Sequence, residues 1–512
     1  MQIFDSKRAS TRVIVNTIAQ YSRSLISIIV ALYSTRLVLA ALGVHDYGIY
    51  SLVAGVVAML SFISNALVST TQRFLSYHQG KGDLRVLSKL WGNIIVLHLV
   101  FSLVLIGILE AVGPFLFNGF LNIAPERIPS AKVVYQCCIF MVTISFLNAP
   151  FLALLISHEN IIYSSVIQII DSFLRLGIAF IITYFGTEKL ILYVTLLCGI
   201  SVLDILSYSI YTFRKYPECV VPRRSHLDKK VIKEMTSYLV WIVYSTGCVV
   251  GRTQGCAIVL NKFFGTIVNT AFGIAQQVSG AISFVSSSLL NAINPQIVKA
   301  EGSGDRKRMF SLAMTASKFS FFLLSMVVLP LVTFMPQIIR LWLGETPEYV
   351  VTFCRVILIT SLCDQITLGL GTANGAIGNV RPYSLTVNSL KLLTVPLLLL
   401  LLWRKVNIYY AIWIYAVMEL VCALCRIPFL HYSGGLNIRE YVMTVFKPLT
   451  IPFLFFCLSY LIIRIIPINF FLNLILAIPA TCIYLAIFYK IGLTTQEKEI
   501  TDKILRKVHI IR

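Results

Sequence analysis

Arginine side chains interrupt two of the long apolar segments of this sequence. Arg23 and Arg252 each lie in such a segment, and neither has an acidic residue within one turn of its own helix. A charge inside a bilayer costs roughly 2.5–3.5 kcal/mol on insertion scales, so it requires a partner or a wet cavity. A guanidinium binds phosphate oxygens through a bidentate fork, and binds them more strongly away from bulk water. The two arginines are therefore predicted to line a cavity that suits a phosphate or a pyrophosphate.

Other charged residues in the apolar segments have simpler expected roles. Asp171 and Arg175 are four residues apart, so they share one face of a helix and are predicted to form a structural pair, with ion coupling as the alternative. Long basic side chains near segment ends extend to the membrane interface. We expect this of Arg355, Lys391 and Arg426. The remaining clear cases are Asp204, Asp364 and Glu419.

Polar residues recur at helical spacing in three apolar segments. In lipid, such residues must face a partner helix or a wet cavity. Small and hydroxyl residues alone would favour close helix packing, whereas the added charges favour a cavity. To this cavity we assign Asn16, Gln20, Gln276 and Asp364 besides the two arginines. The stripes consist of Asn16, Gln20, Arg23, Ser27 and Ser34; of Asn269, Gly273, Gln276, Gly280, Ser283, Ser287 and Asn291; and of Thr360, Asp364, Thr367, Gly371 and Asn374.

The composition is that of an integral membrane protein. Hydrophobic residues make up 57% and charged residues 13% of the 512 residues, whereas a soluble domain carries about 25% charged residues. The net charge of +21 has two interpretations: basic residues concentrated in cytoplasmic loops, or a positive surface that attracts anionic lipid or substrate. Its scatter over short loops argues against a nucleic-acid partner.

A membrane helix needs about 20 largely apolar residues, and fourteen segments meet this requirement. We therefore predict an all-α polytopic membrane protein. The first segment has no cleavage site and is read as an uncleaved helix. Lysine and arginine concentrate in alternate loops, above all 213–235, so both termini are predicted to be cytoplasmic. The segments are 13–35, 48–71, 91–112, 133–156, 164–184, 190–212, 236–260, 267–293, 311–334, 351–372, 383–403, 410–430, 447–466 and 471–490.

A polar turn occurs twice at a constant offset. "QGKGDLRVLSK" (79–89) and "EGSGDRKRMFS" (301–311) share a G-x-G-D pattern, and 43–83 aligns with 265–305 without a gap. The offset spans six predicted helices, so two parallel repeats are expected, an architecture found among transporters. The alternative is that any cytoplasmic turn favours glycine and aspartate. The predicted parts are a lobe 1–212, a basic cytoplasmic linker 213–235, a lobe 236–430, and 431–512 with two extra helices and a basic cytoplasmic tail.

The segment "STRLVLAALGVHDYGIYSLV" (34–53) resembles the first-to-second helix signature of polysaccharide flippases, through the LG at 42–43 and the YG-x-Y at 47–50. With fourteen segments and a repeat from the seventh helix, the chain is similar to the multidrug/oligosaccharidyl-lipid/polysaccharide exporter superfamily. The resemblance implies alternating-access transfer of an undecaprenyl-pyrophosphate-linked oligosaccharide across a bacterial inner membrane, for O-antigen or capsule. It implies that Arg23 and Arg252 receive the pyrophosphate. The second half keeps Gly265 and Phe272 but lacks the YG, and Gln254 lies near the position of an acid in relatives.

Two other functions remain as alternatives. A multidrug/cation antiporter shares the architecture but exports cations, which prefer acidic sites. A membrane enzyme of polysaccharide assembly, a polymerase or an acyltransferase, would need an outer-face site, and the outer loop 113–132 holds one acid, Glu126. We expect no catalytic residues, metal or cofactor: "HEN" at 158–160 lacks the second histidine of a zinc motif, and we read Cys422 and Cys425 as packing residues. Expected partners are membrane lipids, the anionic lipid-linked glycan, and a glycan polymerase or chain-length regulator.

Overall fold

The protein is all-α throughout the part of the chain that the computed structural model describes, which confirms the predicted fold class. It divides into two compact units: unit 1 comprises Met1–Ile14 and Tyr244–Arg512, and unit 2 comprises Val15–Val243. Helix α7 contains the boundary at 243/244, which lies beyond the predicted linker 213–235. The described residues are 2–58, 61–117, 125–184, 188–220, 227–343, 348–465, 470–495, 497–499 and 502.

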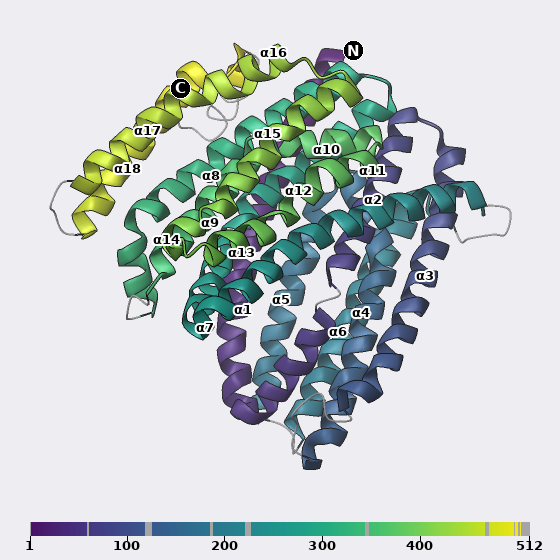
Figure 1. Cartoon of the computed structure of the whole chain (residues 1–512). Helices are drawn as coiled ribbons and strands as arrows, with labels where there is room; N and C mark the ends of the chain where they lie inside the picture. Colours follow the sequence, from purple (N-terminus) through teal and green to yellow (C-terminus); the bar gives the residue numbers. More distant parts are fainter. Residues whose placement is uncertain are drawn as a thin grey trace. The chain divides into compact units, whose positions relative to one another are not determined.

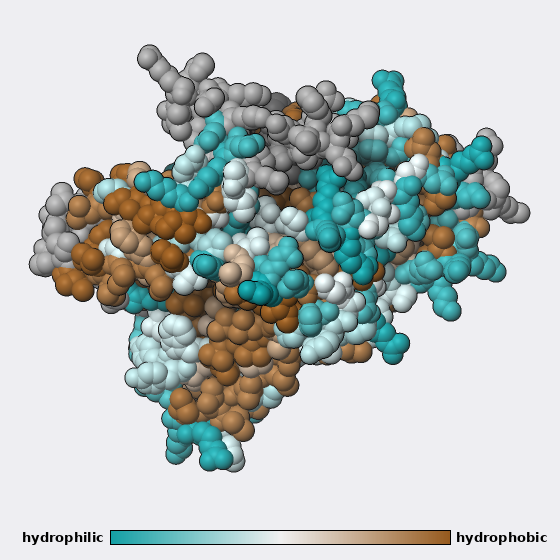
Figure 2. Space-filling model, turned by 90° about the horizontal axis from the view of Figure 1, so that it is seen from above, coloured by the Kyte–Doolittle hydropathy of each residue, from teal (hydrophilic) through white to brown (hydrophobic). Residues whose placement is uncertain are grey.

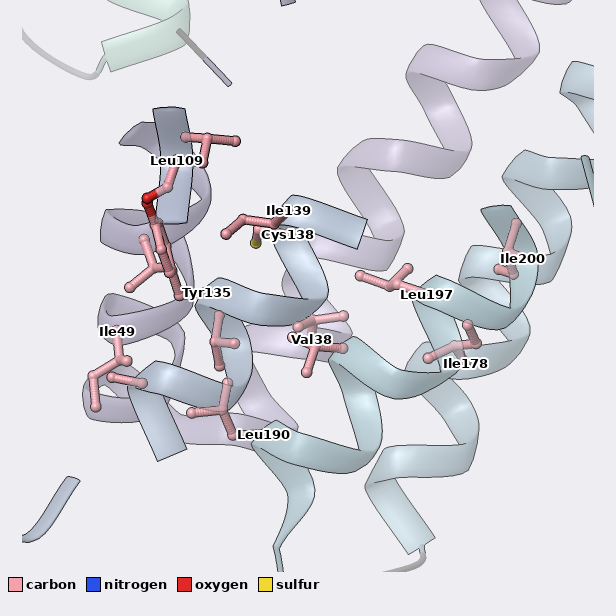
Figure 3. Close-up of a cluster of buried hydrophobic side chains, with 14 of the residues drawn as sticks. Val38, Ile49, Leu109, Tyr135, Cys138, Ile139, Ile178, Leu190, Leu197 and Ile200 are labelled. Carbon is pink, nitrogen blue, oxygen red and sulfur yellow. The ribbon is translucent and has the colours of Figure 1, made fainter. Parts of the chain in front are cut away.

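Unit 2 is built around helix α4, which contacts four other helices: α2, α3, α5 and α6. An apolar cluster fills its interior, and Figure 3 shows Val38, Tyr135 and Leu197 among the side chains that make it up. The Tyr135 hydroxyl donates to the carbonyl of Leu109 at 2.7 Å, which satisfies a polar group that burial would otherwise leave unpaired. The elements are α1 (Gln2–Ala58), α2 (Ser61–Lys81), α3 (Leu84–Phe115), η2 (Pro125–Arg127), α4 (Ile128–Ser157), α5 (Ile161–Tyr184) and α6 (Lys189–Lys215) (Figure 1).

In unit 1, helix α8 contacts α9, α10, α17 and α18. The last two helices pack on α8 through an edge-to-face pair of rings, Phe321 and Phe453 with centroids 5.1 Å apart, and through the Ser325–Tyr484 hydroxyl pair at 2.8 Å. The elements are α7 (Lys229–Gly302), α8 (Arg306–Leu343), α9 (Val350–Gln365), α10 (Leu368–Ile377), α11 (Val380–Tyr383), η4 (Ser384–Asn388), α12 (Ser389–Leu392), α13 (Thr394–Trp403), α14 (Ile408–Ala411), α15 (Ile414–Gly434), α16 (Ile438–Tyr441), η5 (Val442–Phe446), α17 (Lys447–Ile465), α18 (Phe470–Ile487) and η6 (Phe488–Gly492).

The two G-x-G-D turns adopt the same local structure, one in each unit. Gly82 has φ +78° and Gly304 has φ +79°, a left-handed conformation that glycine adopts without steric cost. Asp83 follows in unit 2 and accepts hydrogen bonds from the backbone of Arg85 at 2.9 Å and Val86 at 3.3 Å. Asp305 accepts from the backbone of Arg308 at 3.0 Å. Each aspartate thus satisfies free N–H groups at the start of the next helix.

One of two predicted breaks is helical in the structure. Helix α7 continues from Lys229 to Gly302 across the expected break between 260 and 267. The other break, expected between 35 and 48, is present within α1 as a kink at Gly43, whose backbone is non-helical with φ +76°. By length and composition, ten described helices can cross a membrane, or eleven if the α9–α10 pair, bent by 46°, counts as one span. The predicted segments 48–71, 236–260 and 267–293 are not among them.

Side chains satisfy backbone carbonyls that prolines leave free. Pro150 cannot donate to the carbonyl of Phe146, and the ring of His98 bonds that oxygen at 3.0 Å. Likewise Pro336 cannot donate to Val332, whose carbonyl accepts from Arg355 Nε at 2.9 Å. Our expectation that Arg355 extends to the interface stays a prediction. A freed carbonyl inside a helix bundle is a closer partner than the water outside.

Large apolar side chains are exposed on many helices, as in a multi-pass membrane protein. Leu103 on α3 is 60% exposed and Ile258 on α7 is 68% exposed. Figure 2 shows wide hydrophobic areas next to hydrophilic ones on the face that it displays. A water-soluble protein rarely exposes contiguous apolar areas of this kind.

Candidate functional site

A cavity of about 410 Å³ lies in unit 1, and we call it the charged cavity. Its walls come from α7, α8, α9, α12 and α15, and hydroxyl and amide groups lie between the charges. The polar lining residues are Arg252, Thr253, Gln276, Ser279, Ser283, Thr360, Ser361, Asp364, Gln365, Lys391, Tyr415 and Glu419. Of the predicted site residues, the cavity brings together Arg252, Gln276 and Asp364.

Ion pairs between helices cross the wall of the charged cavity. Arg252 on α7 pairs with Glu419 on α15, and Lys391 Nζ lies 2.7 Å from the same carboxylate. Arg426 Nη2 bonds Asp364 Oδ1 at 2.6 Å, and Lys391 Nζ lies 3.8 Å from that oxygen. Four of the five side chains are nearly buried, while Asp364 is 26% exposed. Such pairing offsets the desolvation of each ion.

The bend between α9 and α10 is held by two side chains. Arg426 Nη1 donates to the carbonyl of Asp364 at 3.3 Å and to the Thr367 hydroxyl at 3.3 Å. The Tyr441 hydroxyl donates to the carbonyl of Ile366 at 2.6 Å. Next to the bend, a Cβ on Gly369 would lie 2.0 Å from the Ala313 carbonyl oxygen, so glycine is required for the approach of α10 to α8. The bend places the Asp364 carboxylate in the cavity wall.

The ion-pair cluster at the charged cavity has one more cation than it has anions, because Arg426 pairs with Asp364 behind a lining whose own charges are balanced. Arg252, Lys391 and Arg426 surround Asp364 and Glu419, which gives one net positive charge when all five groups are ionised. The Arg252 guanidinium also lies 4.3 Å from the centre of the Tyr415 ring. Nε of Arg252 and of Arg426 is buried without a hydrogen-bond partner in the described part of the chain. These groups can exchange a carboxylate for another oxyanion.

The expectation that Lys391 and Arg426 extend to the interface is wrong. Both are buried and hold carboxylates of neighbouring helices. Their acidic partners are distant in sequence, since Glu419 is 167 residues from Arg252 and Asp364 is 62 residues from Arg426. Sequence spacing within one helix gives no signal for such pairs. Once these side chains are buried, a neighbouring carboxylate stabilises their positive charge.

The other predicted cavity residues lie in unit 2, where they bond one another and their neighbours. Arg23 donates to Gln168, to Gln20 Oε1 at 3.4 Å and to Ser24 Oγ at 3.4 Å. Asn16 donates to the carbonyl of Glu159 at 2.8 Å. Within the described ranges, Arg23 forms no ion pair with a carboxylate. The prediction that Arg23 and Arg252 face one common cavity stays a prediction.

A second cavity, of about 280 Å³, lies in unit 2, and we call it the hydroxyl cavity. The motif residues Tyr47 and Tyr50 line it, whereas the surroundings of Gly48 lie outside what the structure describes. Arg175 also lines it and forms the pair with Asp171 that the sequence predicts, with Nε 3.0 Å from each carboxylate oxygen. Its polar lining residues are Ser27, Ser34, Thr35, Tyr47, Tyr50, Ser172, Arg175 and Tyr193.

A polar contact outside both cavities lies near the predicted linker. His158 follows α4, stacks on Tyr216 with centroids 4.1 Å apart, and its Nε2 lies 2.5 Å from Glu218 Oε1. Burial raises the pKa of Glu218, but the hydrogen bond from His158 and the backbone outweighs it, so the pKa is lower than usual. The histidine of the incomplete zinc motif thus ties the end of α4 to the chain after α6.

Metal-binding geometry is not found in the described ranges, where His, Cys, Asp and Glu form no group of three or more suited to an ion. All twelve cysteines are free, and Cys422 is buried. Sequence analysis missed Lys318, which lies within the predicted segment 311–334. This lysine is fully buried on α8 and bonds Glu497 at 2.6 Å and the Gly492 carbonyl at 3.2 Å.

The fold of the chain is that of MATE transporters of the MOP superfamily. One similar structure is described as "Crystal structure of MATE in the bent conformation", with a TM-score of 0.73, 13% identity, and coverage of 85% of this chain and 97% of that chain. Another is an outward-facing multidrug resistance MATE family transporter, with a TM-score of 0.70, 15% identity, and coverage of 86% and 97%. At these identities the likeness shows the fold alone.

Two further proteins are similar to the chain. A MOP superfamily transporter from Pyrococcus furiosus, described by "reverse polarity of binding pocket", gives a TM-score of 0.71 at 13% identity over 85% of this chain and 96% of that one. Uncharacterized membrane protein EpsK of Bacillus subtilis (strain 168) is 20% identical over 333 residues. That match spans 65% of each chain. No protein-family model matches the chain.

Proposed function

We propose that the protein is a transporter that moves an undecaprenyl-pyrophosphate-linked oligosaccharide from the cytoplasmic to the periplasmic leaflet by alternating access. The observation that supports this most is the cluster of five charged side chains in and directly behind the wall of the charged cavity, which has three cations and two anions. A pyrophosphate that leaves the headgroup region must exchange its water and counterions for fixed cations. The lipid tail would stay in the bilayer, because apolar chains gain nothing from a polar cavity.

Recognition of the pyrophosphate would proceed by exchange of oxyanions. Arg252 and Lys391 both hold Glu419, so a phosphate oxygen can take the place of a carboxylate oxygen without leaving either cation unpaired. The guanidinium offers a fork that matches two phosphate oxygens, and the lysine offers a point charge. Gln276 and the cavity hydroxyls supply further donors. Exchange of this kind leaves neither cation isolated, and the displaced, buried Glu419 carboxylate would have to take up a proton.

A multidrug/cation antiporter is the second candidate. Similar structures include a multidrug resistance MATE family transporter, and the Asp364 carboxylate is the most accessible charge of the charged cavity. However, that carboxylate already has two cationic neighbours, Arg426 and Lys391, which oppose the binding of a further cation. The Pyrococcus furiosus protein has a similar fold and is described by a binding pocket of reverse polarity. It is therefore a precedent for a MATE-like fold whose pocket has a different charge.

A transport assay in proteoliposomes distinguishes the two candidates. The full chain would be offered a fluorescent undecaprenyl-pyrophosphate saccharide or the cationic dye ethidium, with leaflet position read by quenching. We expect translocation of the pyrophosphate lipid, and its loss in the Arg252→Gln variant. Translocation of ethidium alone, driven by a cation gradient, would refute the proposal and support the antiporter.

We also propose that the protein resides in a bacterial inner membrane with both termini in the cytoplasm. Lysine and arginine dominate the loops on the predicted cytoplasmic side. Single cysteines at exposed positions of a cysteine-free chain test this, with Lys230→Cys for the linker and Glu126→Cys for the opposite side. An impermeant maleimide should label position 126 in intact spheroplasts and position 230 only after lysis. The reverse pattern would contradict the topology.

A further inference from the structure

The hydroxyl cavity of unit 2 contains hydrogen-bonding groups that the proposed pyrophosphate site does not use. It is lined by three tyrosines, four serine or threonine hydroxyls and one arginine. At about 280 Å³ it is close to the small end of ligand pockets, which measure about 300–1,000 Å³. The size and the polar lining of the cavity thus suit a small polar molecule.

Several donors of this cavity have no partner in the described part of the chain. Arg175 uses only Nε to hold Asp171, so its two terminal nitrogens are unpaired among the described residues. The Ser34 hydroxyl oxygen is shielded from solvent and also lacks a hydrogen-bond partner there. The Arg175 side chain is 45% exposed, so water can reach its nitrogens, whereas the shielded Ser34 oxygen is a buried polar group whose missing partner calls for a ligand or water. These groups lie on two different helices, α1 and α5, that face the same cavity.

Charge argues for a neutral occupant. The Asp171 carboxylate neutralises Arg175, and Asp204 on α6 interacts electrostatically with both. Both carboxylates lie behind the lining, where they offset the charge of Arg175 and weaken its attraction for an anion. A neutral molecule with several hydroxyls can accept from Arg175 and donate to the acids or to the serine oxygens. The hydroxyl cavity is therefore expected to bind a neutral molecule, whereas the charged cavity is proposed to bind an anion.

The tyrosine rings of the hydroxyl cavity further restrict which neutral molecule can bind. Tyr50 and Tyr193 meet edge to face with centroids 5.1 Å apart, and Tyr47 lies 6.3 Å from Tyr50. The negative face of an aromatic ring attracts the polarised C–H bonds of a pyranose ring. A saccharide is the small neutral molecule that offers both hydroxyls at its rim and C–H bonds on its faces.

We propose that the hydroxyl cavity is a binding site for one uncharged sugar residue. The inference rests on the proposed function in that this sugar would belong to the glycan of the lipid-linked substrate. Ser34 and the terminal nitrogens of Arg175 hydrogen-bond its hydroxyls, and Tyr47 packs on its ring. The tyrosines of the YG-x-Y segment are then specificity-determining residues, separate from the charge recognition in unit 1.

Saturation-transfer NMR tests the site on the full chain in lipid nanodiscs. The probes are methyl glycosides of glucose, galactose, N-acetylglucosamine and glucuronic acid. We expect saturation on the ring protons of at least one neutral glycoside and none on the charged glucuronide. Ser34→Ala should weaken binding about three- to tenfold, since it removes one hydrogen bond. Tyr47→Leu should abolish the signal.

A matched control lies on the same helix. Tyr33 is half-exposed on α1 and contacts Phe180 rather than the cavity, so Tyr33→Leu should leave sugar binding unchanged. Absence of saturation transfer for the neutral methyl glycosides and for a neutral dodecyl glycoside alike, or equal signals in wild type and in both Ser34→Ala and Tyr47→Leu, would overturn the proposal. A dodecyl glycoside added in parallel shows whether the sugar must be lipid-borne: binding of that form alone still supports the site.

This outcome is separate from that of the proposed function. Binding of a neutral glycoside requires no pyrophosphate and no translocation. If the pyrophosphate lipid is translocated but no glycoside binds, only the sugar site fails. If glycosides bind at Ser34 and Tyr47 while the pyrophosphate lipid is not moved, the sugar site stands and the proposed function fails.

Discussion

The charged cavity and the hydroxyl cavity differ in where their ion pairs come from. In unit 1, Arg252 and Glu419 come from different helices. In unit 2, Asp171 and Arg175 are four residues apart on α5. A pair within one helix moves with that helix, whereas a pair between helices must break when the helices separate. The comparison shows that the pairs of unit 1 can couple the charge of a ligand to helix movement. The Asp171–Arg175 pair of unit 2 instead fixes the position of Arg175 in the wall of the hydroxyl cavity.

The largest expected effect is at Arg252. Arg252→Gln should lower glycan translocation about ten- to hundredfold, because a charge-assisted hydrogen bond is worth about 1.5–3 kcal/mol. Initial rates in proteoliposomes would measure it. Arg252→Lys should recover part of the rate, since it keeps the charge but loses the fork.

A paired substitution separates ligand contact from simple charge balance. Arg252→Gln alone leaves Glu419 with one cation fewer, and removal of one partner from a buried pair costs about 3–5 kcal/mol. The double variant Arg252→Gln, Glu419→Gln removes both charges. If Arg252 serves only to neutralise Glu419, the double variant will transport at the wild-type rate, and the comparison of the two cavities fails. We expect it to be stable and still inactive.

A smaller effect is expected at Arg23 in unit 2. Its partners are the neutral groups of Gln168, Gln20 and Ser24, so Arg23→Gln leaves no carboxylate unpaired. We expect translocation to fall only severalfold, with normal protein levels and thermal stability. Sequence analysis treats Arg23 and Arg252 as equal partners. Equal losses of translocation in Arg23→Gln and Arg252→Gln would show that the two arginines are equivalent. That result would contradict the difference that we infer between unit 1 and unit 2.

Features set by short spacing could be predicted from the sequence. The turns at Gly82 and Gly304, their capping aspartates and the Asp171–Arg175 pair all depend on residues within five positions of one another. Gln276 and Asp364, which belong to two of the polar stripes, line the charged cavity. Local rules therefore located the polar side of each helix.

Features set by helix packing could not be predicted. The partners of Lys391 and Arg426 lie on other helices, and both residues were read as interface side chains because they are close to segment ends. The loop expected before 267 is helix, since a glycine alone does not end a helix that tertiary packing supports. Lys318 was missed for the same reason, because its partner Glu497 is 179 residues away.

Lys318 offers a test of whether any buried ion pair of unit 1 affects transport. It is as buried as the cavity residues but pairs with Glu497 and is not part of the cavity lining. The double variant Lys318→Met, Glu497→Gln should keep the wild-type transport rate, because it removes both charges and leaves no buried ion without a partner. A loss as large as that of Arg252→Gln, in protein of normal melting temperature, would show that burial rather than cavity position decides the effect.

The contact between His158 and Glu218 gives a pH-dependent effect in unit 2. The pKa of Glu218 is lower in the folded protein than its ordinary value of 4.5, so its carboxylate stabilises the fold fully above that value. This contribution is lost as the pH falls through the lowered pKa. Melting temperatures of wild type and Glu218→Gln should therefore converge on acidification below about pH 4.5. A constant difference at all pH values would exclude the linkage.

The smallest expected effect lies in the two turns, where the units should behave alike. Gly82→Ala and Gly304→Ala each force a side chain into a left-handed conformation, at a cost of about 1–2 kcal/mol. Asp83→Ala and Asp305→Ala each remove a helix cap, at a cost of about 1 kcal/mol. Denaturation in mild detergent would measure these costs, and transport rates should stay unchanged. Because the turns match in φ and in capping, any difference between units must arise elsewhere. A turn substitution that stops transport in one unit only, at equal stability, would show that the turn itself takes part in the transport cycle.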